Sequence, residues 1–358
     1  MPDRIRAAVV GAGVIGELHA KVLDENPRFE IVAIVDRDVD RARALATQTS
    51  LNQPQEPPAL PLDQAIDKAD VVAVCTPSGT HGVLGEQVLS AGRHLVVEKP
   101  IEVSLPAARR LHERANSAPG GPWCVVISQH RFDPAAVALH EAITSGRLGR
   151  PTSGIAVVPW WRGDAYYASA EWRGTLALDG GGALMNQGIH TLDLLLWMHG
   201  PVASVAARSA CLAHQGLEVE DTLGATIAFR SGAIGSLLVT TAAYPELPTR
   251  LQIHGSRGSA VIEGDGLLYF HSSDIDRSGA RHDSGGGENT ATGWYARFDD
   301  GLGLQMGASH ARQYDDLADA LLTGGRPKVT SQEAIETLAV IDAIYRSAET
   351  GAWADPGS

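Results

Sequence analysis

One stretch of the chain, LDGGGALMNQGIHTLDLLLWMHG from Leu178 to Gly200, carries an amide, an imidazole and a carboxylate among apolar residues. Asn186, His190 and Asp193 are spaced four and then three residues apart, and on a helix this spacing places all three on one face. Imidazole titrates near neutral pH, so a histidine on such a face can accept the proton of a hydroxyl group. The stretch therefore predicts a helix that packs its leucines into a core and presents a polar stripe to a site.

A glycine pattern near the amino terminus, VVGAGVIG, places Gly11, Gly13 and Gly16 in the G-x-G-x-x-G spacing between a strand-like run and a helical pattern. In that context the first glycine permits a tight turn, the second lets a pyrophosphate approach, and the third lets helix and strand pack closely. Asp36 ends the second strand-like run, where a carboxylate accepts hydrogen bonds from ribose hydroxyls and repels a 2′-phosphate. The pattern predicts NAD rather than NADP as cofactor, with Arg37 either softening this preference or covering the adenine ring.

A candidate reactive lysine stands in VVEKPI, where an apolar strand-like run ends at Pro100. Ligands of open α/β sheets bind at the carboxyl ends of the strands, so Lys99 is expected near the nicotinamide of a bound dinucleotide. An ammonium group there can hydrogen-bond an oxygen atom and stabilise developing alkoxide charge.

These motifs together carry a specific resemblance. The order GAGVIG, Asp36, CTPSGTH, EKP, GGGALMNQGIHTLD and IYRSAETG resembles the Gfo/Idh/MocA family of NAD(P)-dependent oxidoreductases over nearly the whole chain. The resemblance implies a Rossmann domain, a second domain whose open sheet commonly forms the oligomer interface, and sugars, polyols or their derivatives as substrates. By position, Lys99 matches the family's EKP lysine and His190 its catalytic histidine. His190 is then expected to take the hydroxyl proton as hydride leaves the carbon, while Lys99 bonds the same oxygen.

Asn186 departs from the aspartate that many such relatives carry one turn before the histidine. An amide orients a hydroxyl group but cannot ionise, so Asn186 is predicted to be a neutral catalytic partner and the chemistry depends more on His190 and Lys99. Asp193 is expected either to fix His190 through a ring nitrogen or to bond nearby backbone, and the sequence does not choose between these roles.

A dense aromatic group precedes the polar stripe in a chain that is only 5% aromatic: Trp160, Trp161, Tyr166, Tyr167 and Trp172. Indoles can stack on a sugar ring and arginines can bind carboxylate, phosphate or sulfonate, although a core or an oligomer contact is an equal alternative. By resemblance, Trp172 and Arg173 lie near the nicotinamide.

The candidate substrate-binding residues are Lys99, His130, Arg131, Trp160, Arg162, Asn186 and His190. The candidate cofactor-binding residues are Gly11, Gly13, Val14, Ile15, Gly16, Asp36, Arg37, Thr76, Pro77, His81, Glu98, Lys99, Trp172 and Arg173.

Two patterns of elements must position these residues. Up to about residue 125, near-continuous apolar strands alternate with helices, which predicts a parallel sheet covered on both faces. The expected strands span residues 5–11, 29–36, 69–77, 94–100 and 123–130, and the expected helices span 14–26, 40–48, 81–92 and 104–116.

Beyond about residue 130, a helix at 135–146 and the helix that carries the polar stripe are followed by strand-like runs, which predicts an open, mostly antiparallel sheet. The expected strands span 202–212, 221–230, 232–244, 250–256, 258–264 and 267–272, followed by a polar loop at 276–293 and helices at 311–324 and 330–351. The fold class is therefore α/β, with an N-terminal Rossmann dinucleotide-binding domain at 1–127 and a C-terminal α+β domain at 128–358 for substrate binding and oligomerisation. The final helix, near 331–348, is a candidate to pack back on the Rossmann domain.

The composition limits the classes of partner. A net charge of −13 without a basic run argues against nucleic acid and membrane surfaces. The apolar runs fall short of the ~20 residues that cross a bilayer, and the start of the chain does not resemble a signal peptide, so a cytoplasmic location is expected. Cys75, Cys124 and Cys211 lie far apart and are expected to be buried free thiols, with no metal site and no disulfide framework.

The combined prediction is an NAD-dependent dehydrogenase that oxidises a secondary hydroxyl of a sugar, glycoside or cyclitol, or reduces the matching ketone, as a homodimer or homotetramer. One alternative is an NAD-dependent glycoside-cleaving enzyme that works by transient oxidation and elimination. A second is a cofactor-binding sensor without catalysis, which the presence of both Lys99 and His190 disfavours.

Overall fold

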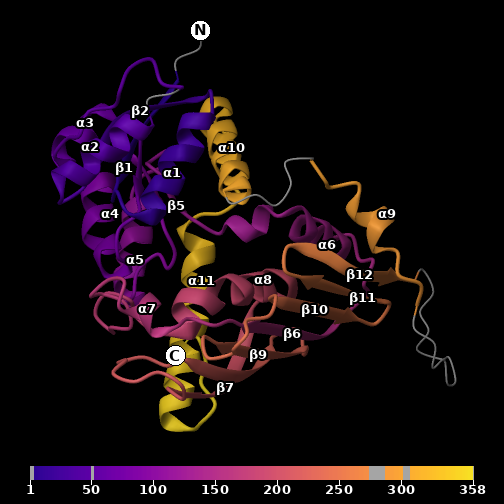
Figure 1. The fold of residues 1–358 in the computed structure, drawn as a ribbon. Helices are drawn as coiled ribbons and strands as arrows, with labels where there is room; N and C mark the ends of the chain where they lie inside the picture. Colours follow the sequence, from indigo (N-terminus) through magenta and orange to yellow (C-terminus); the bar gives the residue numbers. More distant parts are fainter. Residues whose placement is uncertain (1–3, 50–51, 274–286, 301–306, 358) are drawn as a thin grey trace, which may run out of the picture. The chain divides into compact units, whose positions relative to one another are not determined.

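The computed structural model describes residues 4–49, 52–273, 287–300 and 307–357, which form two compact units (Figure 1). The first unit comprises Met1–Gln129, Ala177–Gly180 and Gln305–Glu336, and the second comprises His130–Leu176, Gly181–Leu304 and Thr337–Ser358. Most of the polar loop predicted at 276–293 lies outside the described residues.

The first unit is built on a five-stranded sheet in the order β2-β1-β3-β4-β5. Every pairing is parallel, as the near-continuous apolar runs predicted. The order reverses between β1 and β3, and the carboxyl ends of strands at such a point form the crevice where dinucleotides bind. The strands are β1 (Ile5–Val10), β2 (Phe29–Val35), β3 (Val71–Val74), β4 (His94–Val97) and β5 (Cys124–Val126).

Helices cover this sheet: α1 (Val14–Glu25), α2 (Val39–Gln48), α3 (Leu62–Lys68), α4 (His81–Ser90), α5 (Leu105–Ala115) and α10 (Ala308–Thr323), with a 3₁₀ turn at Ser78–Thr80. The position of α10 is not evident from the local sequence pattern, because this helix follows the whole of the second sheet along the chain. Tyr314, Leu317 and Ala318 of α10 are buried in the same core as Leu23 and Phe29.

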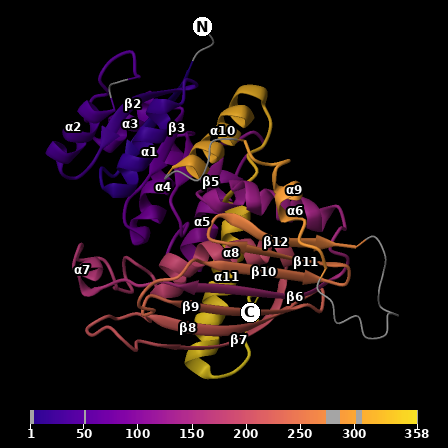
Figure 2. The ribbon, with the colours of Figure 1, turned by 45° about the vertical axis from the view of Figure 1, so that its right-hand side comes forward.

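The second unit is built on a seven-stranded sheet in the order β12-β11-β10-β6-β9-β8-β7 (Figure 2). The pairing of β6 with β9 is parallel and the other pairings within this sheet are antiparallel, so the prediction of an open, mostly antiparallel sheet is confirmed. The strands are β6 (Pro151–Pro159), β7 (Val202–Ala210), β8 (Thr222–Phe229), β9 (Ile234–Thr240), β10 (Arg250–Gly255), β11 (Gly258–Glu263) and β12 (Gly266–Ser272).

The central strand β6 was not predicted from the sequence. Prolines bound it and Gly154 interrupts it, and both residue types normally argue against a strand. Gly154 faces α8 (Ile189–His199), and a Cβ there would lie 2.5 Å from the His199 Nε2 atom. The glycine is therefore needed for the close approach of this helix to the sheet.

One face of the second sheet is covered by α8 and by α6 (Pro134–Thr144), while Ile155, Ile234 and Leu238 are exposed on its strands. The remaining helical elements among the described residues are a 3₁₀ turn at Gln129–Phe132, α7 (Asp164–Tyr167), a π-helical turn at Leu184–Gly188, α9 (Ala291–Tyr295) and α11 (Ser331–Thr350). The last of these begins in the first unit and ends in the second. Among the residues that the structure describes, no helix has the length and apolar character to span a membrane.

Two of the three cysteines, Cys75 and Cys124, are buried as expected, but the prediction for Cys211 was wrong, because its side chain is exposed. It follows the end of β7, whose last three residues are exposed.

Candidate active site

The glycine loop of the first unit joins β1 to α1 and has the geometry that the sequence predicted. Gly11 has a φ of +100°, and a Cβ there would lie 2.6 Å from the Cys75 carbonyl oxygen. At Gly16 a Cβ would lie 1.7 Å from the Gly11 carbonyl oxygen, whereas at Gly13 it would meet nothing within 4 Å. Val14 and Ile15, which open α1, are exposed. The first turn of α1 therefore combines the N–H groups of a helix amino terminus, which can bind an anion, with the exposed side chains of Val14 and Ile15.

Asp36 follows β2 and is bonded to the glycine loop itself. Its Oδ2 accepts a hydrogen bond from the Ala12 backbone N–H at 2.7 Å, and Oδ1 accepts one from the Asp38 N–H at 2.9 Å. A carboxylate can accept about four hydrogen bonds, so these two leave capacity for ribose hydroxyls. The sequence pointed to the ribose contact but not to this second role, which ties the end of β2 to the loop. Arg37 beside it is exposed.

Lys99 lies half-buried just beyond the end of β4, between two buried polar groups of the first unit. On one side, the Glu98 carboxylate accepts the backbone N–H of Lys99 at 3.0 Å. On the other, the fully buried His81 has Nδ1 2.8 Å from the Pro100 carbonyl oxygen and Nε2 2.9 Å from the Thr76 carbonyl oxygen. A neutral imidazole donates to only one of these carbonyls at a time, and burial lowers the pKa of His81 and so favours the neutral form.

The side chains of Glu98 and His81 form hydrogen bonds to other residues of the first unit. Their predicted roles in cofactor binding therefore stay predictions. Thr76 and Pro77 are half-buried, and the Thr76 hydroxyl lies 2.7 Å from that of Thr80. The loops after β3 and β4 are joined by His81, which contacts the carbonyl oxygens of Thr76 and Pro100.

The polar stripe of the second unit begins in a π-helical turn at Leu184–Gly188, which continues into α8. The sequence predicted a regular helix here, so this part of the prediction was wrong. Asn186 lies within the π turn, and its Nδ2 donates a hydrogen bond to the Gly181 carbonyl oxygen at 3.0 Å. Such turns are rare and occur frequently at functional sites.

Three glycines before this turn allow a buried cap on the helix. A Cβ at Gly182 would lie 1.7 Å from the Glu220 carbonyl oxygen, and one at Gly181 would lie 2.2 Å from the Tyr345 hydroxyl oxygen. The Glu220 carboxylate accepts the N–H groups of Gly182 and Leu184, each at 2.9 Å, and the Tyr345 hydroxyl at 3.1 Å. Burial raises the pKa of Glu220 despite these donors. Sequence reasoning missed Glu220 and Tyr345, although the glycine triplet signalled that something approaches closely.

His190 lines a cavity of about 130 Å³ within the second unit. The polar residues around it include His130, Asp133, Gln187 and Asp265, and Trp160 contributes an aromatic wall. Both charged and apolar side chains thus surround the histidine, as in small-molecule sites.

A second histidine lies against the first. The rings of His130 and His190 meet edge to face with centroids 5.1 Å apart, and His130 Nδ1 lies 2.6 Å from Asp133 Oδ2. Burial opposes protonation of His130, but the hydrogen bond and charge of Asp133, with smaller contributions from Asp265 and Asp193, outweigh it and raise its pKa. The cavity therefore contains two imidazoles, of which His130 holds its proton more tightly than an ordinary histidine.

Asp193 has side-chain partners that neither of the two sequence interpretations named. Arg131 donates to it through Nε and Nη2, both at 2.7 Å, and the Thr337 hydroxyl donates at 2.9 Å. The side chains of Arg131 and Asp193 are each 10% exposed. The polar stripe thus divides, with Asp193 tying α8 to α11 and to the segment before α6. The substrate-binding role of Arg131 stays a prediction beside this structural one.

The aromatic group forms a stack around two arginines. The Arg173 guanidinium lies 4.2 Å from the centroid of Tyr166 and 4.6 Å from that of Trp172, and it donates to the Tyr166 hydroxyl at 2.7 Å. The Arg162 guanidinium lies 4.9 Å from the Trp160 centroid and 3.1 Å from the Glu246 carboxylate. The structure therefore brings together Trp160 with Arg162, and Trp172 with Arg173, as the sequence grouped them.

The predicted site residues fall in both units. Lys99 and the glycine loop belong to the first unit, and His190, Asn186, His130 and the aromatic group belong to the second.

Two groups of described side chains have ligand types and spacing suited to a cation, although the sequence predicted no metal: His19, Glu98 and His310, and His130, Asp133 and Asp265.

Comparisons with known proteins agree with this fold and glycine loop. Residues 5–120 match the oxidoreductase family with an NAD-binding Rossmann fold, and residues 136–261 match the Gfo/Idh/MocA C-terminal domain. The chain belongs to the Gfo/Idh/MocA family of oxidoreductases, as the motifs indicated, and its first unit is the family's NAD-binding Rossmann fold.

Several relatives are similar over most of their length. The WlbA dehydrogenase from Bordetella pertussis, solved in complex with NADH and UDP-GlcNAcA, is 30% identical, with 99% of each chain covered and a TM-score of 0.82. The scyllo-inositol 2-dehydrogenase (NAD(+)) of Bacillus subtilis is 27% identical over 73% of this chain and 75% of its own length. The D-glucoside 3-dehydrogenase of Escherichia coli is 29% identical over 64% of this chain and 68% of its own length. All three relatives are thus named dehydrogenases, one named for scyllo-inositol, one for a D-glucoside and one solved with UDP-GlcNAcA.

Proposed function

We propose that this protein is an NAD-dependent dehydrogenase that oxidises a secondary hydroxyl of a sugar, glycoside or cyclitol, or reduces the matching ketone. The observation that carries the proposal is the cavity around His190, which combines a histidine base with polar and aromatic walls. The names of the relatives support the same class of substrate. In this proposal residues 1–127 bind the cofactor and residues 128–358 bind the substrate and form a homodimer or homotetramer.

The chemistry requires a proton and a hydride to leave the substrate together. Bound NAD supplies the hydride acceptor. His190 accepts the hydroxyl proton, because a neutral imidazole has one ring nitrogen free to act as a general base. Lys99 donates a hydrogen bond to the same oxygen and stabilises its developing negative charge. Asn186 orients a hydroxyl group without carrying charge.

The homo-oligomer and the cytoplasmic location stay part of the proposal. The exposed apolar side chains of Ile155, Ile234 and Leu238 on the strands of the second sheet support an interface there.

The experiment that tests this function is a screen of sugars, glycosides and cyclitols with NAD that follows both NADH absorbance and product mass. Accumulation of NADH together with a product two hydrogens lighter than the substrate is the expected result. If no member of these classes is oxidised while NAD binds, the dehydrogenase proposal fails and the sensor alternative is favoured.

The glycoside-cleaving alternative is favoured by one observation, the second imidazole beside His190. After oxidation at a ring carbon, the neighbouring C–H becomes acidic. His190 can then remove that proton as base, while protonated His130 gives a proton to the oxygen of the departing aglycone. Water would then add to the ring, and the hydride held by bound NADH would be available to restore the hydroxyl. Cleavage of a glycoside without net NADH would identify this activity in the same screen.

We expect Asp36 to set the preference for NAD over NADP. Coulomb repulsion between a carboxylate and a 2′-phosphate at about 4 Å is worth about 1–4 kcal/mol near a protein surface. Asp36→Ser should therefore shift the ratio of the two dissociation constants toward NADP by about tenfold or more. Asp38→Ser is the matched control, because Asp38 carries the same charge two residues away and caps α2, a role that serine can keep. Tighter binding of NADP than of NAD by the unmodified protein would show that Asp36 has been misassigned.

Asn186→Asp should change the pH dependence of oxidation. A carboxylate one helical turn from His190 stabilises the imidazolium form, so the base releases its proton only at higher pH. The acidic limb of the oxidation profile should move upward. Loss of the amide donor to the Gly181 carbonyl should also cost about 1–3 kcal/mol of stability. Asn186→Ala is the control, since it loses the same donor without adding charge. Superimposable profiles for all three proteins would place Asn186 outside the proton-transfer network.

A further inference from the structure

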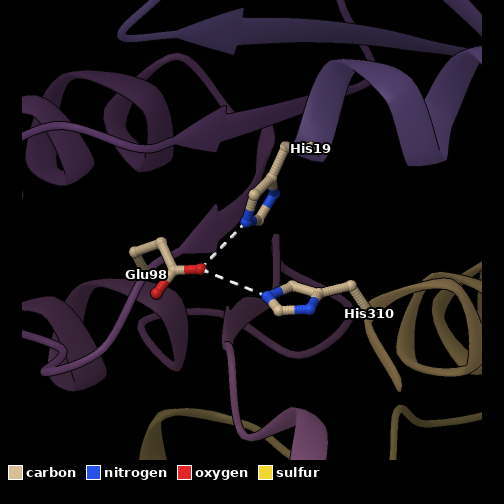
Figure 3. Close-up of side chains that lie close together, drawn as sticks. All are labelled: His19, Glu98 and His310. Carbon is tan, nitrogen blue, oxygen red and sulfur yellow. Dashed lines mark hydrogen bonds and ion pairs between the residues drawn. The ribbon is translucent and has the colours of Figure 1, made fainter. Parts of the chain in front are cut away.

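A buried network surrounds Glu98, the residue that precedes Lys99 (Figure 3). Its Oε1 atom lies 2.9 Å from His19 Nε2 and 3.5 Å from His310 Nε2, and Oε2 accepts the Lys99 backbone N–H at 3.0 Å. Figure 3 shows the two imidazoles directed at the same carboxylate oxygen, one from α1 and the other from α10. The side chains of His19, Glu98 and His310 are each at most 8% exposed.

The protons of this network have one consistent arrangement. Burial by itself would raise the pKa of Glu98, but the interactions with His19 and His310, chiefly hydrogen bonding, hold it well below its usual range. An ionised carboxylate only accepts hydrogen bonds, so His19 Nε2 donates to it. The Tyr314 hydroxyl lies 2.7 Å from His19 Nδ1, and burial raises the pKa of Tyr314, which keeps its proton for that bond. Hydrogen-bond donation therefore runs from the Tyr314 hydroxyl to His19 and from His19 to the Glu98 carboxylate.

The network links the glycine loop and α1 to the chain segment of Lys99. The proposed reaction needs a fixed distance between these two segments, because one binds the cofactor and the other contacts the substrate. His19 lies on α1, whose first turn follows the glycine loop, and Glu98 directly precedes Lys99. Well-packed apolar residues of similar volume often stabilise a buried site as well as paired charges do. Stability alone therefore does not account for a carboxylate and two imidazoles at this position.

We propose that His19, His310 and Tyr314 are positioning residues that act through Glu98 to hold Lys99 in its reactive place relative to the cofactor loop. This inference rests on the proposed catalytic role of Lys99. Reacting groups must be held within fractions of an ångström, and loss of groups that orient a reactive residue typically costs about 10- to 100-fold in rate. His310 is the most informative of the three, because α10 reaches the network from the far end of the chain.

The test is a double-mutant cycle between His310 and Lys99, read by single-turnover hydride transfer to NAD with the substrate identified in the screen. His310→Leu should lower this rate about 10- to 100-fold in the native background. In the Lys99→Ala background it should change the rate by less than about threefold, because its effect passes through the missing lysine. The NAD dissociation constant should stay within about threefold in every variant. An equal loss of rate in both backgrounds would overturn the proposal and leave a merely structural role.

Two further variants separate positioning from loss of stability. His310→Gln can still donate one hydrogen bond toward Glu98 and should recover most of the rate that His310→Leu loses. Leu317→Val, in the same core on α10, should lower the melting temperature without lowering the rate. If His310→Gln is as slow as His310→Leu, or Leu317→Val is equally slow, the hydrogen bond is not the cause.

The same experiments distinguish this inference from the function on which it rests. Unchanged turnover in Lys99→Ala would overturn the catalytic role of Lys99. Slow Lys99→Ala together with unimpaired His310→Leu would overturn the positioning role alone. Metal analysis of the purified protein gives a further outcome. If the native protein contains one zinc ion per chain and His310→Leu contains none, these residues form a metal site and the positioning proposal is overturned.

Discussion

His190→Ala and Lys99→Ala should each lower turnover by about 10²–10⁴-fold, the range typical of lost acid–base groups, while NAD still binds. Without His190 the hydroxyl proton has no base positioned to receive it, and without Lys99 the oxygen loses a charged donor. Both residues are half-buried, and His190 lines the cavity of the second unit. The measurement is the steady-state turnover number on the identified substrate, with NAD binding followed by fluorescence titration.

His140→Ala is the control for the first of these changes. His140 stacks on Trp197 at 3.9 Å within the second unit and takes no part in the proposed chemistry. It should retain near-native turnover. A His190 or Lys99 variant that also turns over at nearly the native rate would remove that residue from the mechanism.

Two of the three glycines of the cofactor loop, Gly16 and Gly13, should respond to alanine in opposite ways. At Gly16 the new methyl group would lie 1.7 Å from the carbonyl oxygen of Gly11, and neither backbone can move without distorting the loop. Gly16→Ala should therefore destabilise the protein without cofactor by about 1–3 kcal/mol or more. At Gly13 the methyl group meets nothing within 4 Å, and the φ of −89° suits alanine. Gly13→Ala should keep its melting temperature and lose NAD affinity, because the methyl group stands where the pyrophosphate approaches.

Melting temperatures without cofactor and NAD dissociation constants, measured on both variants, check this pair. Gly293→Ala serves as the control, because a Cβ at Gly293 meets nothing within 4 Å and the residue has no positive φ. Gly232 is unsuitable, because its φ of +85° would strain any side chain. A stable Gly16→Ala protein, or a Gly13→Ala protein with native NAD affinity, would contradict the roles assigned to these glycines.

Much of the first unit could be predicted because its signals are local. The parallel strands are continuous apolar runs, the glycine loop is a short spacing, and Asp36 ends the next strand, so each feature needs only neighbouring residues. The helix that carries His190 was also predictable from its period, but its π turn was not. That turn accompanies the close approach of Glu220 and Tyr345 to Gly181 and Gly182, which no local pattern encodes.

The sequence by itself determined the class of protein and the cofactor fold, through short motifs whose meaning does not depend on distant contacts. The same motifs predict Lys99 and His190 as the reactive pair, and that role stays a prediction. Only the tertiary structure decided that Asp193 pairs with Arg131, that His130 lies against His190, and that α10 brings His310 to Glu98. His310 and Glu98 are more than two hundred residues apart, and their contact arises because the core of the first unit is completed by a helix from beyond the second sheet. Packing of buried apolar surface selects that partner helix, and the polar side chains that it carries are brought into contact as a consequence.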